Sequence, residues 1–238
     1  MDCPPDQPAP SDRDLPGLGI RTPLQPYITT ALGASEVRLL ELASAYRAMA
    51  SGILAEPYII DRVLGASGEV LYDAARATLA FSSTDLSLIQ EGLRGVVRIP
   101  EGTAHSLHGR DFPIPVMGKT GTTSDFRDAL FVGSTYGPLG ITVAVRMGFD
   151  DNRGLGAKET GGRAALPIFR EIMLHAYQRE LVGAVPLFPR EIEDRIDQYL
   201  VRQAALKAGR DDPESAGPDD GPTSSGQRSV ANDSRGIR

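Results

Sequence analysis

Hydrophobic positions along the chain first follow helical spacing and then strand-like spacing. From residue 31 to Gly52, apolar residues recur every three or four positions, and Gly52 stands where a left-handed residue ends a helix. The stretch YIIDRVLGASGEVLY then places two short β-rich runs on either side of residues 65–68, which predicts a hairpin. A second amphipathic helix is predicted from about Ser83.

Three strand-like runs follow a loop rich in Gly, His and Pro. They cover residues 115–123, 129–135 and 140–149, and the turn YGPLG joins the last two. The third run alternates apolar and polar residues, as expected for a strand with one buried face. The runs predict an antiparallel hairpin beside a third strand.

Two further helices are predicted after the strands. The first has Pro167 in its first turn, ends at Gly183 and is expected to pack on the sheet. Its predicted inner face is formed by Ile168, Ile172, Met173 and Ala176. The second covers about residues 189–207 and has a thin apolar stripe. The predicted fold class is α/β of the α+β type, an antiparallel sheet packed with helices.

Composition narrows the class of protein. The 238 residues are 41% hydrophobic and 24% charged, as in ordinary globular proteins, which excludes a collagen or a disulfide-stapled miniprotein. The formal net charge of −6 disfavours a nucleic-acid partner. The single cysteine, Cys3, cannot form an internal disulfide. No signal peptide, membrane-spanning segment or anchor is expected in this chain.

The segment from Gly118 to Thr123, GKTGTT, is the most informative motif. Gly-Lys-Thr also closes a nucleotide-binding P-loop, but that motif needs a glycine five residues before Gly118. Pro113 stands there, and proline has no backbone N–H to donate to a phosphate. We therefore exclude ATP binding.

Lys-Thr-Gly is also a strand motif of penicillin-recognising serine enzymes. In that interpretation the Lys119 ammonium supports proton transfer around a serine nucleophile. Thr120 and Thr122 flank Gly121, so their hydroxyls reach the same face of a strand and can bind a substrate carboxylate. Gly121 lets a ligand approach the strand, and the backbone N–H of Thr122 can donate to an oxyanion.

Other segments extend this motif match. Residues 18–176 resemble the C-terminal half of the transpeptidase domain of class A penicillin-binding proteins, the bifunctional peptidoglycan transglycosylase/transpeptidases. The matching blocks are LGI, ALGASEVRLLELASAYRAMASG, EGLRGVVRIPEGTA, GKTGTTSDFRDALFVG and GFDDNRGLGAKETGGRAALPIF. The resemblance implies a partial penicillin-binding transpeptidase fold of the serine β-lactamase-like type. It also implies that Thr160 lies near the cleft and helps to line the substrate site.

The same resemblance implies the chemistry of the parent enzyme. That enzyme is a D,D-transpeptidase that cross-links peptidoglycan stem peptides and is acylated by β-lactams, so these are the expected partners. The family implies no cofactor, and it implies a location on the periplasmic, extracytoplasmic side of the cytoplasmic membrane. Transpeptidation is therefore the activity expected of the whole domain.

Two motifs of the family are missing from this chain. It contains neither Ser-x-x-Lys, which carries the nucleophile, nor Ser-x-Asn, which carries the proton relay. The nearest matches pair Ser35 with Arg38 and Ser44 with Arg47, and arginine cannot act as a base because it stays protonated. We expect the nucleophile and two of the family's five strands to precede Met1, so that this chain alone is inactive and exposes a bare sheet edge. The missing N-terminal half of the domain is then a possible partner.

Two alternatives remain open from the residues. One is a non-catalytic remnant or binding module of the same fold, which would keep Lys119 and perform no chemistry. The other is a serine β-lactamase or a D,D-carboxypeptidase, against which the LGI and GASE blocks argue.

Further candidate residues have weaker support. His105 and His108 are spaced three apart after Glu101 but lack a third well-placed ligand, so no metal site is expected. Arg127 and Asp128 follow the Lys-Thr-Gly strand and are expected to form a structural ion pair.

The chain divides into four segments by sequence pattern. A Pro-rich irregular segment covers residues 1–17, and the transpeptidase part covers residues 18–183. A C-terminal helix is predicted in residues 184–208, and residues 209–238, which are rich in Asp, Gly, Pro and Ser, are predicted to be a disordered tail.

Overall fold

The computed structural model describes residues 18–24, 26–33, 35–74, 78–80 and 83–208. The predictions for residues 1–17 and 209–238 lie outside these ranges. None of the helices within the ranges is long and apolar enough to cross a bilayer. In chain order the elements are η1 (Ile28–Leu32), α1 (Leu39–Ser51), β1 (Ile53–Ala55), β2 (Arg62–Leu64), β3 (Val70–Asp73), β4 (Thr78–Ala80), α2 (Ser83–Arg98), η2 (His105–Leu107), β5 (Met117–Thr122), η3 (Ser124–Phe126), β6 (Asp128–Ser134), β7 (Thr142–Gly148), η4 (Gly161–Ala165), α3 (Leu166–Gln178) and α4 (Arg190–Ala208).

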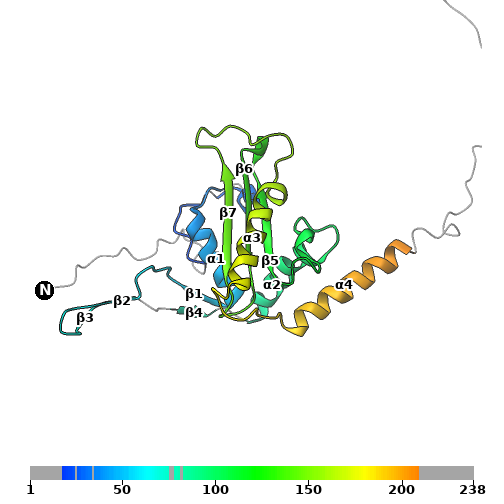
Figure 1. The fold of residues 1–238 in the computed structure, drawn as a ribbon. Helices are drawn as coiled ribbons and strands as arrows, with labels where there is room; N and C mark the ends of the chain where they lie inside the picture. Colours follow the sequence, from blue (N-terminus) through cyan, green and yellow to red (C-terminus); the bar gives the residue numbers. More distant parts are fainter. Residues whose placement is uncertain (1–17, 25, 34, 75–77, 81–82, 209–238) are drawn as a thin grey trace, which may run out of the picture. The chain divides into compact units, whose positions relative to one another are not determined.

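The three predicted strands form one antiparallel sheet in the order β5-β6-β7 (Figure 1). Residue Met117 pairs with Ser134 at one end of the β5–β6 ladder, and Thr122 pairs with Ala129 at the other. The turn after β6 joins it to β7 in unbroken register from Ser134–Thr142 to Asp128–Gly148. The predicted hairpin beside a third strand is confirmed.

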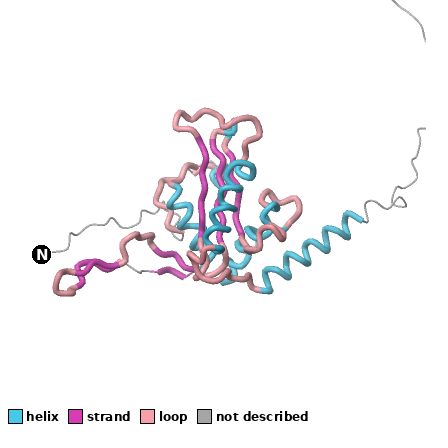
Figure 2. The backbone as a smooth tube through the Cα atoms, in the orientation of Figure 1, coloured by secondary structure: helices cyan, strands magenta, loops and turns pink. Residues whose placement is uncertain are grey.

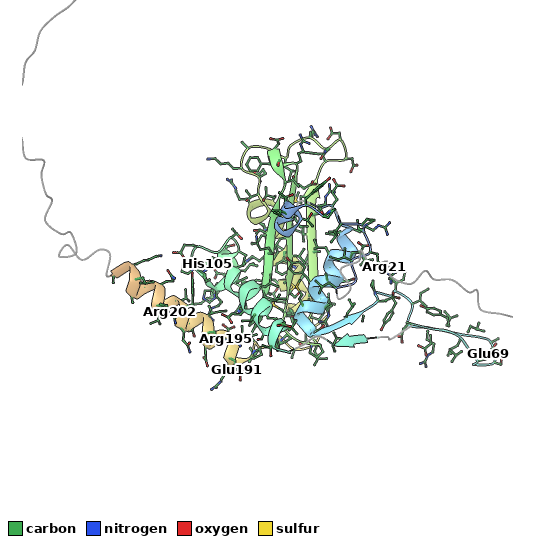
Figure 3. All side chains as sticks on the ribbon, turned by 180° about the vertical axis from the view of Figure 1, so that it is seen from behind. Arg21, Glu69, His105, Glu191, Arg195 and Arg202 are labelled. Atoms are coloured by element: carbon green, nitrogen blue, oxygen red, sulfur yellow. The ribbon has the colours of Figure 1, made fainter. Side chains whose placement is uncertain are left out.

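Helices cover both faces of this sheet. Figure 1 shows α3 in front of the strands, and the reverse view in Figure 3 shows α1 and α2 in front of them. On the α3 side, the rings of Phe131 and Phe169 meet edge to face with centroids 4.7 Å apart, and both residues are fully buried. Val132, next to Phe131, is also buried, because neighbouring strand residues point to opposite faces and both faces are covered.

The helix α3 departs from its prediction in two ways. Its buried stripe is formed by Leu166, Phe169 and Met173, of which only Met173 was predicted, whereas the predicted Ile168 and Ile172 are exposed. The buried stripe has i, i+3, i+7 spacing and carries the bulkier residues, which explains why it faces the sheet.

The helix α3 also ends at Gln178, five residues before the predicted stop at Gly183. Glu180 adopts a left-handed conformation with φ 54°, and the N–H of Leu181 donates to the carbonyl of Ala176 at 2.9 Å. This is a Schellman-type stop without glycine.

The first predicted helix is shorter than expected. Gly33, with φ 91°, ends the short helix η1, and α1 starts only at Leu39. The predicted stop at Gly52 is confirmed, with φ 75° and its N–H bonded to the carbonyl of Ala48 at 2.8 Å.

A second, smaller hydrophobic core joins β5 to α1 and α4. Met117 of β5 and Ala50 of α1 pack there with Phe188 and with Ile192 and Ile196 of α4. The thin apolar stripe predicted for the last helix is therefore buried in its first half.

The predicted hairpin forms as β2 and β3, and β1 pairs with β4 (Figure 2). Every residue of β2 and β3 is exposed. These two strands make their main contact with each other.

Candidate active site

The candidate site lies on β5, one of the two edge strands of the three-stranded sheet. Lys119 pairs with Val132 of β6 and has an exposed side chain. Its Nζ donates to the carbonyl oxygen of Thr120 at 3.0 Å, and it has no carboxylate partner among the described residues. Since a carbonyl is a weak competitor for an ammonium, this charge is available to an anionic ligand.

Thr120 and Thr122 lie on one face of β5, as the alternation predicted, and each hydroxyl has a partner. The Oγ1 atoms of Thr120 and Thr103 lie 2.8 Å apart. The hydroxyl of Thr122 accepts from the N–H of Gly161 at 3.1 Å, which leaves its own hydrogen free to donate. Thr103 was missed by the sequence reasoning, although it lies in the quoted block that ends in EGTA.

Close backbone packing brings the start of η4 against β5. A side chain at Gly161 would collide with the backbone of Leu130 and Gly121, so this approach requires glycine. A side-chain carbon at Gly162 would lie 3.9 Å from both the Thr160 hydroxyl oxygen and the Thr120 methyl group. The predicted Thr160 therefore lies close to the Lys-Thr-Gly strand.

The backbone N–H of Thr122 has a favourable direction. The N–H of Thr123 donates to the carbonyl of Asp128 on β6 at 3.1 Å. Donors alternate in direction along an antiparallel strand, so the Thr122 N–H points away from β6, toward the open edge of β5. That is the side on which a ligand can accept from it.

Two charged residues after β5 pair differently from the prediction. Arg127 and Asp128 do not pair with each other. Arg127 pairs with Asp125 at 3.2 Å, whereas Asp128 pairs with Arg146 of β7 at 2.5 Å. Asp128 opposes Gly148 in the ladder, so Arg146, two residues along, is its diagonal neighbour on the same face.

The two candidate histidines lie together near the end of α2. Their ring centroids are 5.5 Å apart, and Nδ1 of His105 lies 3.1 Å from the carbonyl oxygen of Val97. In the ranges that the structure describes, no three His, Cys, Asp or Glu side chains gather around a common point.

Known proteins match the chain over the region that holds this site. The family described as "Penicillin binding protein transpeptidase domain" matches residues 19–174. Penicillin-binding protein 1A of Aquifex aeolicus is 38% identical over 152 residues, which are 63% of this chain and 20% of that protein. Penicillin-binding protein 1A of Rickettsia prowazekii is 27% identical over 207 residues, which are 77% of this chain and 25% of that protein.

A solved structure gives the same answer for the fold. The crystal structure of penicillin-binding protein 1A from Haemophilus influenzae aligns with a TM-score of 0.56 and 25% identity, over 74% of this chain and 32% of that one. The chain thus spans between a fifth and a quarter of the two curated relatives. It has the serine β-lactamase-like fold and belongs to the penicillin-binding protein transpeptidase domain family.

Proposed function

We propose that this chain is part of a peptidoglycan D,D-transpeptidase and supplies the substrate-carboxylate site and one donor of the oxyanion hole. The observation that carries the proposal is Lys119, an exposed ammonium without a carboxylate partner among the described residues, on an open strand edge. Two threonine hydroxyls and an outward N–H lie along the same strand. This arrangement suits an anionic ligand that binds as an extended strand beside β5.

Each residue then has a defined role. The hydroxyls of Thr120 and Thr122 donate to the carboxylate of a terminal D-Ala, and Lys119 attracts that carboxylate and supports proton transfer. As a serine attacks the D-Ala-D-Ala carbonyl, the Thr122 N–H donates to the developing oxyanion. D-Ala leaves with a proton, and the acyl group passes from the serine to an amine of a neighbouring stem peptide, which loses a proton.

The serine itself has to come from another segment. Neither Ser-x-x-Lys nor Ser-x-Asn occurs in the sequence. The same observation favours the alternative function, a non-catalytic module of this fold that binds stem peptides or β-lactams without reacting. In both cases the site works on the periplasmic, extracytoplasmic side of the cytoplasmic membrane, where peptidoglycan is assembled, and needs no metal or organic cofactor.

A labelled penicillin separates these functions. The purified 238-residue chain is expected to show no covalent adduct on a denaturing gel, because it lacks the serine motif. An antibody raised against this chain then identifies, in membranes of the source cell, the polypeptide that contains the segment. If that polypeptide is labelled, the enzyme is supported. If it is not labelled, the non-catalytic alternative replaces it.

Lys119 provides the residue-level control. In the labelled polypeptide, Lys119→Ala is expected to slow acylation by about a hundredfold, since a charge that acts in proton transfer or binding is lost. Arg62→Ala, which removes an exposed cation from β2, is the matched variant and should react at the normal rate. Equal rates for the two variants would contradict the role of Lys119.

A further inference from the structure

A buried arginine of α2 reaches the start of the Lys119 strand. Arg94 is only 7% exposed, and its Nη1 donates to the carbonyl oxygen of Val116 at 2.7 Å. Its Nε donates to the Glu193 carboxylate of α4 at 3.0 Å, and its guanidinium carbon lies 4.7 Å from the centre of the Phe188 ring. One guanidinium therefore joins three separate parts of the chain.

The position of Val116 makes this contact important for β5. The ladder to β6 begins with Met117, so the Val116 carbonyl lies just before the paired strand. In the described sheet β5 is an edge strand, held by β6 on one side only. Arg94 attaches the residue just before this strand, three positions ahead of Lys119.

Further ion pairs connect α2 and α4 beside Arg94. Glu193 also accepts from Arg98, and Arg98 donates to Asp197 at 2.6 Å. Burial lowers the pKa of Arg94, and the Glu193 carboxylate opposes that effect and favours its charged form. A buried cation with good partners is costly to disturb, because removing one partner leaves charge without compensation.

A further ion pair between the same two helices shares no residue with this network. Arg195 of α4, labelled in Figure 3, lies 3.2 Å from Glu91 of α2. Among the described residues, neither side chain forms a hydrogen bond or ion pair with β5. A variant that breaks this pair therefore tests the packing of α4 on α2 without disturbing the contact to β5. The helix α4 begins after residue 174, where the family match ends.

We propose that Arg94 is a positioning residue for the Lys119 strand, and that the C-terminal helix contributes to the site through the carboxylate of Glu193. The role of the strand in catalysis rests on the proposed transpeptidase function. The attachment of β5 by Arg94 and Glu193 does not. This attachment fixes the position of the strand that carries Lys119 and the Thr122 N–H.

Hydrogen exchange on the 238-residue chain tests the attachment. Arg94→Lys keeps the charge but loses the two separately directed donors that reach Val116 and Glu193, so amide exchange in residues 117–122 should quicken by about tenfold relative to β6 and β7. Glu193→Gln leaves Arg94 in place, so it is a second test if the Arg94→Lys protein does not fold. It should act in the same direction. Arg195→Gln should leave the exchange of β5 unchanged. If all three variants act alike, or none does, the attachment is wrong.

Acylation tests the consequence for the site. In the source-cell polypeptide, Arg94→Lys should lower the acylation rate constant for labelled penicillin by about tenfold, with a smaller effect on the initial binding constant. Arg195→Gln should keep both constants. An Arg94→Lys protein that reacts as fast as Arg195→Gln would overturn the positioning role. If the unaltered polypeptide is not acylated, the transpeptidase function fails, and the exchange comparison alone judges the attachment.

Discussion

The β5–β7 sheet and the β2–β3 hairpin were predicted by the same kind of sequence pattern but have opposite environments. In the sheet, Phe131 and Val132 are buried on opposite faces. In the hairpin, Leu71 is 63% exposed, and Ile59, just before β2, is fully exposed. Short runs of strand-forming residues bounded by turns form strands in both regions. Burial depends on what covers the strand.

The difference has a simple cause. Helices pack on both faces of the sheet, whereas β2 and β3 mainly contact each other. Glu69, labelled in Figure 3, lies in the turn between these two strands. A two-stranded hairpin alone is marginally stable in water. We therefore expect the two regions to respond very differently to mutation.

The largest expected effect is in the sheet core. Phe131→Ala removes a fully buried ring that packs edge to face on Phe169, and should lower the free energy of unfolding by about 3–5 kcal/mol. Urea unfolding followed by circular dichroism measures this. A loss below about 1 kcal/mol would mean that the core is not packed as described.

Overpacking at the same place should have a smaller effect. A side-chain carbon at Gly133 would lie 2.7 Å from the ring of Phe169, so Gly133→Ala should destabilise the fold by about 1–3 kcal/mol. Gly92 of α2 is the matched control, because nothing lies within 4 Å of the added carbon. There the alanine should stabilise by up to about 1 kcal/mol, because it favours helix. Equal signs for the two variants would contradict the packing.

Sequence reasoning predicted those parts of the fold that local patterns control. The three strands of the sheet, to within two residues at each end, followed from strand-like runs, and the stop at Gly52 followed from glycine's tolerance of positive φ. The end of α3 did not follow, because Glu180 takes a conformation in which glycine is usual. The inner face of α3 was only partly right. Met173 is buried as predicted, but Ile168 and Ile172 are exposed, because packing on the sheet selected the stripe that contains Leu166 and Phe169.

The candidate site shows the same limit. Lys119 and its neighbours were recognised because the motif is contiguous. Thr103, from the loop after α2, joins Thr120 only through the fold. Arg94 and Glu193 are 99 positions apart, and a single sequence contains no signal that pairs them. Residues that act through long-range contacts are therefore the ones that sequence reasoning misses.

The hairpin should tolerate what the sheet does not. Leu71→Ala in β3 is expected to change the free energy of unfolding by less than about 0.5 kcal/mol, because the side chain is already in water. Its amides should exchange far faster than those of β6. A loss comparable to that of Phe131→Ala would show that the hairpin is covered in solution, and the contrast between the two regions would fail.

The smallest expected effect concerns pH and also differs between the regions, since residues 53–80 contain no histidine. Burial, together with Arg98, Arg94 and His105, lowers the pKa of His108 below its ordinary value of 6.5, while Glu193 acts against them. The unfolded chain therefore takes up this proton first as the pH falls. Stability from this group is complete above about pH 6.5 and is lost as the pH falls through the folded-state pKa.

His108→Gln should consequently flatten the decrease in the urea midpoint between about pH 7.5 and about pH 5.5. The change should be small, because His108 is an exposed residue and solvent screens its interactions with the arginines. Identical slopes for the variant and the unaltered chain would show that His108 does not sense the arginines of α2.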